Sequence, residues 1–531
     1  MGKPYLGLAI VLASAFACSA APPTPSPSPF EPATAASVPT AGELKRDLTV
    51  FASDSFRGRE TGTNDERRAA AFLVARLTAL GLTGAGDSGF YQRVPLVSQA
   101  LGPATRFTVS TPSRTMTLIP MIDLVPILDI GGDEPPPKAN AEGALVFAGY
   151  GVGNDFWNVP IKGHVVVLVN GAPPRTAPNE RAALESESAI TARLERLIPM
   201  HPAGIIILLT GASTDVATRI SRELSRSLEL AGPSPDALPD GERPVPMILI
   251  GRPSAGSPLL PPGWTGDGTP RVLHGRRFTG HIELRRQGVS SYNVVAVVPG
   301  TDPALRRTYV AYGAHYDHLG ILPPDHGDSV ANGADDDGSG SVALLALARA
   351  FASARSAPRR SILFVWHVGE EKGLLGSAYF TEHPTVPIDS IVAQINADMI
   401  GRNNPESLYV VGPLAAPHGQ SRVLGEVVDS VNRALAHPFV FNRDWDSLSS
   451  PEQIYYRSDH YNYARKGVPI VFFTSGLHAD YHRVTDKPAK IDYDKLAHVD
   501  LLMLNLGTAL ANRDIRPVEQ PSVVSAKRRT R

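Results

Sequence analysis

Apolar and polar positions follow two successive patterns in the first half of the chain. In "AGELKRDLTVFAS" (41–53) and "NDERRAAAFLVARLTALG" (64–81) apolar residues recur at helical spacing, which predicts two amphipathic helices, the second closed by Gly81. From about Phe107, short β-rich runs separated by Gly and Pro take over, such as "GHVVVLVNG" and "AGIIILLTG". Closely spaced short strands predict a separate, mainly β module over residues 118–285 with a helix or two, the helical candidate being "ERAALESESAITARLERLI".

From residue 286 onward, apolar runs alternate with helical patterns. Strands are expected at "RTYVAYGAH", "RRSILFVWHVG", "DSIVAQINADMIG", "SLYVVG" and "VPIVFFTSG". Helices are expected at "SVALLALARAFASA", "GQSRVLGEVVDSVNRALA" and "DKLAHVDLLMLNLGTALAN". This alternation predicts the α/β class, a three-layer sandwich in which helices cover a mixed, mainly parallel sheet.

The N-terminal segment has the pattern of an export signal. One lysine is followed by an apolar run, Tyr5–Ala17, that is too short to span a membrane comfortably and ends in small residues. Residues 1–17 are therefore interpreted as a signal peptide, and the Pro/Ser/Ala-rich residues 18–40 as an extended linker. Cys18 stands at the expected cleavage point, so a lipid-anchored lipoprotein and a freely secreted protein both remain open, and both imply export to the periplasm or the exterior.

Composition narrows the classes of function only slightly. The 531 residues are enough for two or three domains, and 51 basic against 52 acidic residues leave a net charge of −1, which does not suggest a partner such as nucleic acid. A single cysteine excludes an intramolecular disulfide. The basic residues 516–531 are expected to be a disordered tail.

Acidic and histidine residues gather just after the strands expected in the second half. They are His315 and Asp317, the aspartates of "GADDDGSG", Glu370 and Glu371, Asp398, and His478 and His482. Each alone has an ordinary explanation, such as a turn or a helix cap. Ligands of such folds bind beyond the carboxyl ends of the strands, and five coincidences at that edge predict a functional site.

The chemistry of these residues favours metal ions. Three adjacent carboxylates in "DDD" repel one another, and a helix start needs at most one of them as a cap. Imidazole and carboxylate groups without any thiolate favour zinc or a similar divalent ion. Two neighbouring ions need a bridging carboxylate, terminal ligands and an open position for water, so two metal ions are expected here.

The ordered motifs "GAHYDHLG", "NGADDDGSGS", "EEKGLLGS", "NADMIG", "RSDHYNYARKGVP" and "YHRVTD" resemble those of the di-zinc aminopeptidase family, which also includes glutamate carboxypeptidase-type enzymes. The resemblance covers roughly Ser290 to Ala511 and implies a catalytic zinc-exopeptidase domain over residues 286–515. The β-rich residues 118–285 resemble an inserted protease-associated domain, and residues 41–117 resemble the N-terminal part of the catalytic domain.

Carried over residue by residue, the resemblance implies a complete catalytic site. The zinc ligands would be His315 and Asp398 for one ion, Glu371 and His482 for the other, and Asp336 as the bridge, with a strained peptide bond after it. Glu370 would be the general base and Asp317 the residue that orients His315. Asp459 and His460 would support the substrate side.

These residues imply an exported, zinc-dependent metallopeptidase that binds two Zn²⁺ per chain. The leading interpretation is an aminopeptidase that acts on peptide substrates. A glutamate carboxypeptidase-like hydrolase remains open, and for it Arg402, Arg457 and Arg465 are available to bind a substrate carboxylate. Two further hypotheses are glutaminyl cyclase chemistry with one zinc and a non-catalytic binding module of the same fold. The complete set of ligands and base speaks against both.

Overall fold

The structure is a computed structural model, and it describes residues 38–127, 138–153, 155–210, 227–231, 246–251, 257–354, 357–413, 421–447 and 450–517. The expected signal peptide and Cys18 lie outside these residues, as do nearly all of the linker and the basic tail. Within the described residues, no helix combines the length and the apolar character that crossing a bilayer requires.

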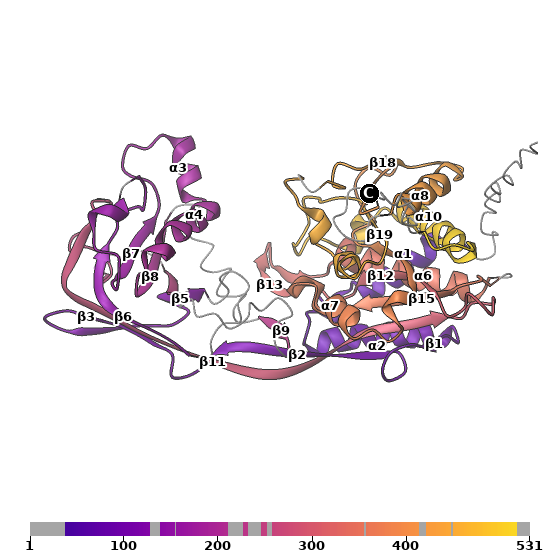
Figure 1. Cartoon of the computed structure of the whole chain (residues 1–531), viewed down its shortest axis with the longest axis horizontal. Helices are drawn as coiled ribbons and strands as arrows, with labels where there is room; N and C mark the ends of the chain where they lie inside the picture. The colour runs from indigo at the N-terminus through magenta and orange to yellow at the C-terminus, as the bar shows by residue number, and fades with distance from the viewer. Residues whose placement is uncertain are drawn as a thin grey trace, which may run out of the picture.

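The larger of two connected units is built on a mixed, mainly parallel sheet (Figure 1). Its centre consists of four parallel strands in the order β15 (Ser361–His367), β12 (Tyr309–His315), β16 (Ile391–Ala397) and β19 (Ile470–Thr474). Antiparallel strands flank them: β11 (Arg271–Val298) beside β15, and β17 (Ser407–Val411) beside β19. The sheet continues with β2 (Tyr91–Leu101), which pairs with both β11 and β9 (Leu228–Leu230), and short strands β1 (Thr83–Gly84) and β18 (Val440–Asn442) complete it. The predicted fold class is therefore confirmed.

Helices cover both faces of this sheet because side chains alternate along each strand. Val310 and Tyr312 of β12 face one core, which is completed by α1 (Ala41–Phe51), α2 (Asn64–Ala79), α6 (Gly340–Ala352), α8 (Arg422–Arg433) and α10 (Tyr493–Asn512). Ala311, between them, faces the opposite core with α7 (Leu375–Glu382) and α9 (His460–Arg465). Such a three-layer arrangement buries the sheet on both sides and explains its continuous apolar runs.

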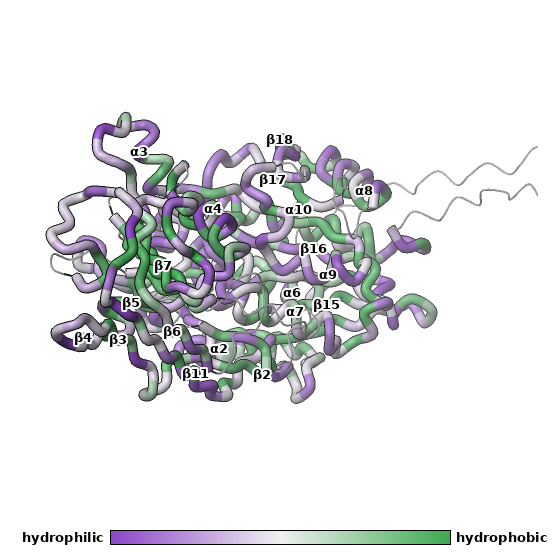
Figure 2. The backbone as a smooth tube through the Cα atoms, turned by 60° about the vertical axis from the view of Figure 1, so that its left-hand side comes forward, coloured by the Kyte–Doolittle hydropathy of each residue, from purple (hydrophilic) through white to green (hydrophobic). Residues whose placement is uncertain are grey.

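The second unit has its own sheet, which β11 joins to the first. The 28 residues of β11 pair with β2 in the larger unit and, nearer their start, with β3 (Arg106–Ser110) and β6 (Lys138–Phe147). The remaining strands are β4 (Thr115–Leu118), β5 (Leu124–Ile127), β7 (Val165–Asn170), β8 (Gly204–Leu209) and β10 (Met247–Gly251). β7 is fully buried and appears as an apolar segment in Figure 2.

Two features of this second unit differ from the sequence pattern. The helical candidate at residues 180–198 forms two helices, α3 (Pro178–Glu185) and α4 (Glu187–Leu197). They separate at Ser186, where the backbone is extended. The hydroxyl of Ser186 caps the second helix by accepting a hydrogen bond from the main-chain N–H of Ala189. In addition, β3 and β4 pair within this sheet although they begin before residue 118. The expected domain boundaries stay a prediction.

The other predicted helices and strands lie within a few residues of their expected ends, but several elements had no clear pattern. α7 and α9 are too short to show helical periodicity, and β2 was not recognised. A hairpin of β13 (Gly320–Asp325) and β14 (Asp328–Ala331) also escaped the sequence analysis. It lies between His315 and Asp336 in the sequence.

Candidate metal centre

Every segment singled out for its acidic and histidine residues reaches the same edge of the larger sheet. His315 is the last residue of β12, and Asp398 follows β16 directly. Glu370 begins a short turn, Glu370–Lys372, after β15, and His482 lies in the loop after β19. The carboxyl ends of these parallel strands lie side by side, which is why residues far apart in the sequence meet here.

Asp336 lies between two clusters of side chains and faces each with a different oxygen. Its Oδ1 is 3.2 Å from Nε2 of His315, and its Oδ2 is 3.3 Å from Nε2 of His482. Only 3% of Asp336 is exposed, and its Oδ2 makes no hydrogen bond. A buried carboxylate that divides its oxygens in this way has the geometry of a bridge between two cations.

The first cluster surrounds His315. Its Nε2 lies 3.6 Å from Asp398 Oδ1 and 3.8 Å from Glu370 Oε2. Its Nδ1 lies 3.1 Å from the main-chain oxygen of Asp317, whereas the Asp317 carboxylate is 3.8 Å away. The shorter contact of this imidazole is thus with the main chain of Asp317, and the orientation of His315 by the Asp317 side chain stays a prediction.

The carboxylate of Asp317 has other partners. Its Oδ1 accepts a hydrogen bond from the main-chain N–H of Glu370 at 3.2 Å, and its Oδ2 accepts one from the hydroxyl of Thr61 at 2.7 Å. Asp317 thus ties the strand that carries His315 to the turn that carries Glu370, and Thr61 orients that link from the N-terminal part of the chain.

The second cluster contains Glu371 and two histidines. Glu371 Oε2 lies 3.1 Å from Nε2 of His482, and Oε1 lies 2.7 Å from Nδ1 of His318. His318 is fully buried and is 3.9 Å from Asp336 Oδ2. Sequence reasoning missed His318, although it is the second histidine of "HYDHLG".

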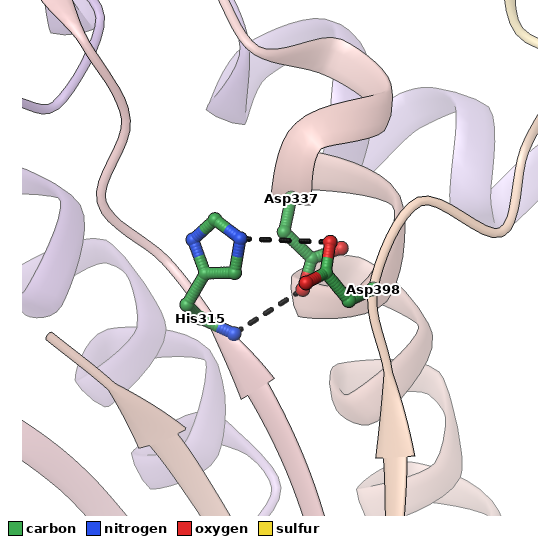
Figure 3. Close-up of side chains that lie close together, drawn as sticks. All are labelled: His315, Asp337 and Asp398. Atoms are coloured by element: carbon green, nitrogen blue, oxygen red, sulfur yellow. Dashed lines mark hydrogen bonds and ion pairs between the residues drawn. The ribbon is translucent and has the colours of Figure 1, made fainter. Parts of the chain in front are cut away.

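Asp337, next to the bridging position, has a structural role. Figure 3 shows its carboxylate against the main-chain N–H of His315, a bond of 3.2 Å. Asp337 also accepts the N–H groups of Gly340 and Met399, at 2.9 and 3.3 Å. Both of its oxygens are thus occupied by the backbone. The peptide bond between Asp336 and Asp337 is cis, at the position where the resemblance implied an irregular one.

Asp335 is engaged on the other side of the bridge. Its Oδ1 accepts the main-chain N–H of Gly401 at 2.7 Å, and its Oδ2 lies 3.2 Å from Nε2 of His478. The three adjacent aspartates therefore point in three directions. Asp336 alone directs its carboxylate between the two clusters.

The buried charges of the centre strongly perturb one another. Burial opposes ionisation of Asp336, but the neighbouring imidazoles of His315 and His482 hold its pKa well below the ordinary value. Burial also lowers the pKa of His315, yet Glu370 and Asp398 raise it well above the ordinary range. Buried polar atoms without hydrogen bonds face one another here, His315 Nε2, Asp336 Oδ2 and Glu371 Oε1 among them. Nitrogen and oxygen donors so arranged fit zinc or a similar divalent cation.

Glu370 also lies at this centre, beside His315. Its carboxylate is 3.8 Å from His315 Nε2, and burial, together with Asp398 and Glu371, raises the pKa of Glu370 well above the ordinary value. A carboxylate with a raised pKa at a metal site is suited to proton transfer.

An apolar cleft opens beside the two clusters. Trp445, Ile454, Phe472, Leu477 and Met399 line it, with Tyr481 and Arg457. Arg457 Nη2 donates to the hydroxyl of Tyr481 at 3.2 Å. Asp459 and His460 are fully buried, and His460 stacks on Phe472 with ring centroids 4.6 Å apart. His460 thus supports the cleft wall, as does the stacking of Trp445 on Tyr409 at 4.0 Å.

This α/β protein presents residues at the carboxyl edge of its sheet that are arranged to hold a pair of cations. Residues 293–507 match the model of peptidase family M28. It is 30% identical over 206 residues to leupeptin-inactivating enzyme 1 of Streptomyces exfoliatus, which is 38% of this chain and 40% of that one. It is 28% identical over 247 residues to leucine aminopeptidase 1 of Trichophyton rubrum, which is 44% of this chain and 62% of that one. The chain thus spans less than two thirds of the length of either relative.

Two solved structures share the fold over most of the chain. The aminopeptidase from Aneurinibacillus sp. strain AM-1 has a TM-score of 0.53 and 15% identity, covering 91% of this chain and 96% of that chain. BSAP, a zinc aminopeptidase from Bacillus subtilis, has a TM-score of 0.51 and 18% identity, covering 90% and 96%. At this identity the likeness establishes the fold.

Proposed function

We propose that this protein is a zinc-dependent metallopeptidase, and specifically an aminopeptidase that removes residues from the free amino end of peptides. The observation that carries the proposal is Asp336, which faces His315 with one oxygen and His482 with the other. The family match supports the proposal, as do the aminopeptidase names of the relatives.

The proposed ligands divide the centre into two halves. His315 and Asp398 would hold one zinc, Glu371 and His482 would hold the other, and Asp336, which faces both clusters, would be shared between them. Zinc bound there supplies Lewis-acid polarisation of the scissile carbonyl and a water of lowered pKa. These roles are inferred from the distances above and from the resemblance of the motifs.

Glu370 acts as general base and then as general acid. It takes the proton that the attacking water loses and later delivers it to the leaving nitrogen. Asp317 holds the Glu370 turn through its main-chain N–H, at 3.2 Å, and so keeps the carboxylate beside His315. The apolar cleft next to this carboxylate would take an apolar side chain of the substrate.

The carboxypeptidase hypothesis depends on an arginine placed to bind a substrate carboxylate. Arg402 is engaged by Asp480 at 2.8 Å, and Arg465 lies over the ring of Tyr461. Arg457 lines the cleft, so it is the residue on which this second candidate rests. Substrates that differ in which end is free distinguish the two functions.

The decisive experiment compares two substrate sets on zinc-loaded protein. One set consists of aminoacyl-nitroanilides with a free amine, and the other of N-acylated peptides that end in a free carboxylate. Two zinc ions per chain and cleavage only of the first set are expected. Cleavage only of the second set would assign the protein to the carboxypeptidase type, and absence of bound zinc would overturn both.

We also propose that the protein is exported, on the basis of the apolar run Tyr5–Ala17. Mass spectrometry of protein from a bacterial host should show a new N-terminus near Cys18. A diacylglycerol on Cys18 would establish the lipoprotein form, and an uncleaved N-terminus would contradict export by this route.

A further inference from the structure

Arg59 is a buried arginine whose hydrogen bonds all go to main-chain carbonyls. Its Nε donates to the oxygen of Tyr316 at 2.8 Å, Nη1 to that of Asn332 at 2.7 Å and Nη2 to that of Gly333 at 2.9 Å. A further bond from Nη1, at 3.3 Å, reaches the oxygen of Phe51. The residue is fully buried, and within the described part of the chain it makes no ion pair with a carboxylate at salt-bridge distance.

Three of these four carbonyls, those of Tyr316, Asn332 and Gly333, belong to the segments that carry the proposed ligands. Tyr316 directly follows His315, and Asn332 and Gly333 lead into the turn that contains Asp336. The guanidinium therefore joins the end of β12 to the start of the aspartate turn. Because its donors form a rigid planar fork, it sets both the separation and the orientation of the two segments.

The main chain around Arg59 reinforces the same attachment. The N–H of His318 donates to the oxygen of Arg59 at 3.3 Å, and the N–H of Gly320 donates to that of Gly58 at 3.0 Å. The N-terminal loop is thus fastened to the segment from Tyr316 to Gly320 by side chain and backbone together.

The backbone adopts an unfavourable conformation to place this side chain. Arg57, Gly58 and Arg59 have φ values of 48°, 73° and 50°, three consecutive residues in the left-handed region. A Cβ at Gly58 would lie 2.4 Å from the oxygen of Ala331. Left-handed arginines are costly, and such conformations persist where the surrounding structure over-determines them, often near functional sites.

The guanidinium also lies in a field of buried carboxylates. Burial lowers the pKa of Arg59 to about 10, and the negative charges of Asp317, Asp486 and Asp336 oppose this shift. Arg59 remains charged at neutral pH. Two roles are therefore separable, one of charge and one of geometry.

We propose that Arg59 is a positioning residue for the metal centre, because its guanidinium holds the carbonyls of Tyr316, Asn332 and Gly333 in the register that brings His315 to Asp336. This inference rests on the proposed function in that it requires zinc to bind at these residues. It adds a residue from a distant loop that touches neither zinc nor substrate.

The sign of the effect on zinc affinity separates geometry from charge. By Coulomb's law, removing a nearby positive charge favours a bound cation. If Arg59 acted by its charge alone, a protein with a neutral residue at this position would therefore bind zinc more tightly. Loss of the bonds to the ligand-bearing segments weakens zinc binding instead. Outer-shell changes of this kind typically cost about 10- to 100-fold in metal affinity.

A matched control exists in the second unit. Arg193 is also almost fully buried, and burial likewise lowers its pKa to about 10. It donates to the main-chain oxygens of Tyr150 at 2.8 Å, Leu184 at 3.0 Å and Gly171 at 3.2 Å. Removing it disrupts a comparable set of bonds without touching a ligand-bearing segment.

The experiment measures zinc affinity and stoichiometry by chelator competition on the full chain, together with thermal unfolding of the zinc-free protein. The variants are Arg59→Met, which removes charge and fork, Arg59→Lys, which keeps the charge without the fork, and Arg193→Met. We expect both Arg59 variants to bind at least one zinc about 10- to 100-fold more weakly. Arg193→Met should unfold at a lower temperature with unchanged zinc affinity.

Three outcomes would overturn the inference. Unchanged or tighter zinc binding by Arg59→Met would assign Arg59 to charge or to general stability. Full zinc affinity in Arg59→Lys would likewise assign Arg59 to charge or to general stability. Arg59→Lys also keeps the test valid if Arg59→Met does not fold. Equal weakening by Arg193→Met would show that any lost stability lowers affinity. Wild-type protein that binds no zinc would instead refute the proposed function itself.

Discussion

Asp336 Oδ2 lies 3.3 Å from His482 Nε2, while the other oxygen of the same carboxylate is turned toward His315. His482 comes from the loop after β19 and Asp336 from the turn before α6, so this contact closes the centre across the edge of the sheet. Burial lowers the pKa of His482, but the carboxylates of Glu371 and Asp336 raise it to about 10.

Replacing Asp336 should prevent the protein from binding two zinc ions tightly at the same time. In Asp336→Asn the side chain keeps its shape, but it loses the negative charge that would be shared between the two ions. We expect fewer than two zinc ions per chain after dialysis at micromolar free zinc, and hydrolysis lowered by at least about 100-fold. Metal analysis and the nitroanilide assay measure the two effects.

The neighbouring carboxylate provides the contrast for this prediction. Both oxygens of Asp337 accept main-chain N–H groups, so Asp337→Asn should mainly lower stability and leave two zinc ions bound. Loss of zinc in Asp337→Asn with retention in Asp336→Asn would show that the bridge has been assigned to the wrong aspartate.

Glu370→Gln should separate catalysis from metal binding. The substitution keeps the volume and removes the proton acceptor, and general acid–base catalysis typically contributes about 10²- to 10⁴-fold. We therefore expect a fall of that size in kcat with two zinc ions still bound and an unchanged melting temperature. Activity comparable to that of the wild type would refute the assignment of Glu370 as the base.

The sequence allowed this centre to be placed at a strand edge, and the reason lies in particular residues. His315, Glu370 and Asp398 each follow an apolar run long enough to be recognised as a buried strand, and parallel strands bring their carboxyl ends together. The expected α/β class followed from the same runs.

The residues behind the centre could not be found in this way. Arg59 and Thr61 lie in a polar loop, and their partners, Tyr316 and Asp317, are 257 and 256 residues further on. No local period encodes such contacts. The role of His318 depends on which way its ring turns, and the main-chain contact of Asp317 depends on backbone geometry, so neither is visible in the order of residues.

The two histidines beside Glu371 should differ in their effect on zinc. His482 approaches both Asp336 and Glu371 within about 3.3 Å and is partly exposed, whereas His318 is fully buried and lies 3.9 Å from Asp336. We expect His482→Ala to reduce the content to one zinc per chain, and His318→Ala to retain two with weaker affinity. Isothermal titration with zinc would resolve the two sites, and the reverse order would make His318 the ligand.

A buried glutamate behind the centre should make stability depend on pH. Glu66 of α2 accepts bonds from the hydroxyls of Tyr316 and Ser291, and burial raises its pKa from 4.5 to about 7. The folded protein therefore keeps the proton over a range in which the unfolded chain has lost it. The contribution of Glu66 to the free energy of unfolding is therefore fully present below pH 4.5. It declines by about 3 kcal/mol as the pH rises to about 7, and it is constant above that pH.

Two variants test this dependence through urea unfolding between pH 4.5 and 8. In Glu66→Gln no group titrates at this position, so the variant does not lose the stability that the wild type loses as the pH rises. The free energy of unfolding of Glu66→Gln minus that of the wild type should therefore increase by about 3 kcal/mol over that range. Ser291→Ala removes a bond that lowers the pKa of Glu66, so the decline should extend to higher pH. A constant difference between Glu66→Gln and wild type at every pH would mean that Glu66 ionises alike in the folded and unfolded chains, and its burial beside Tyr316 would then have no electrostatic cost.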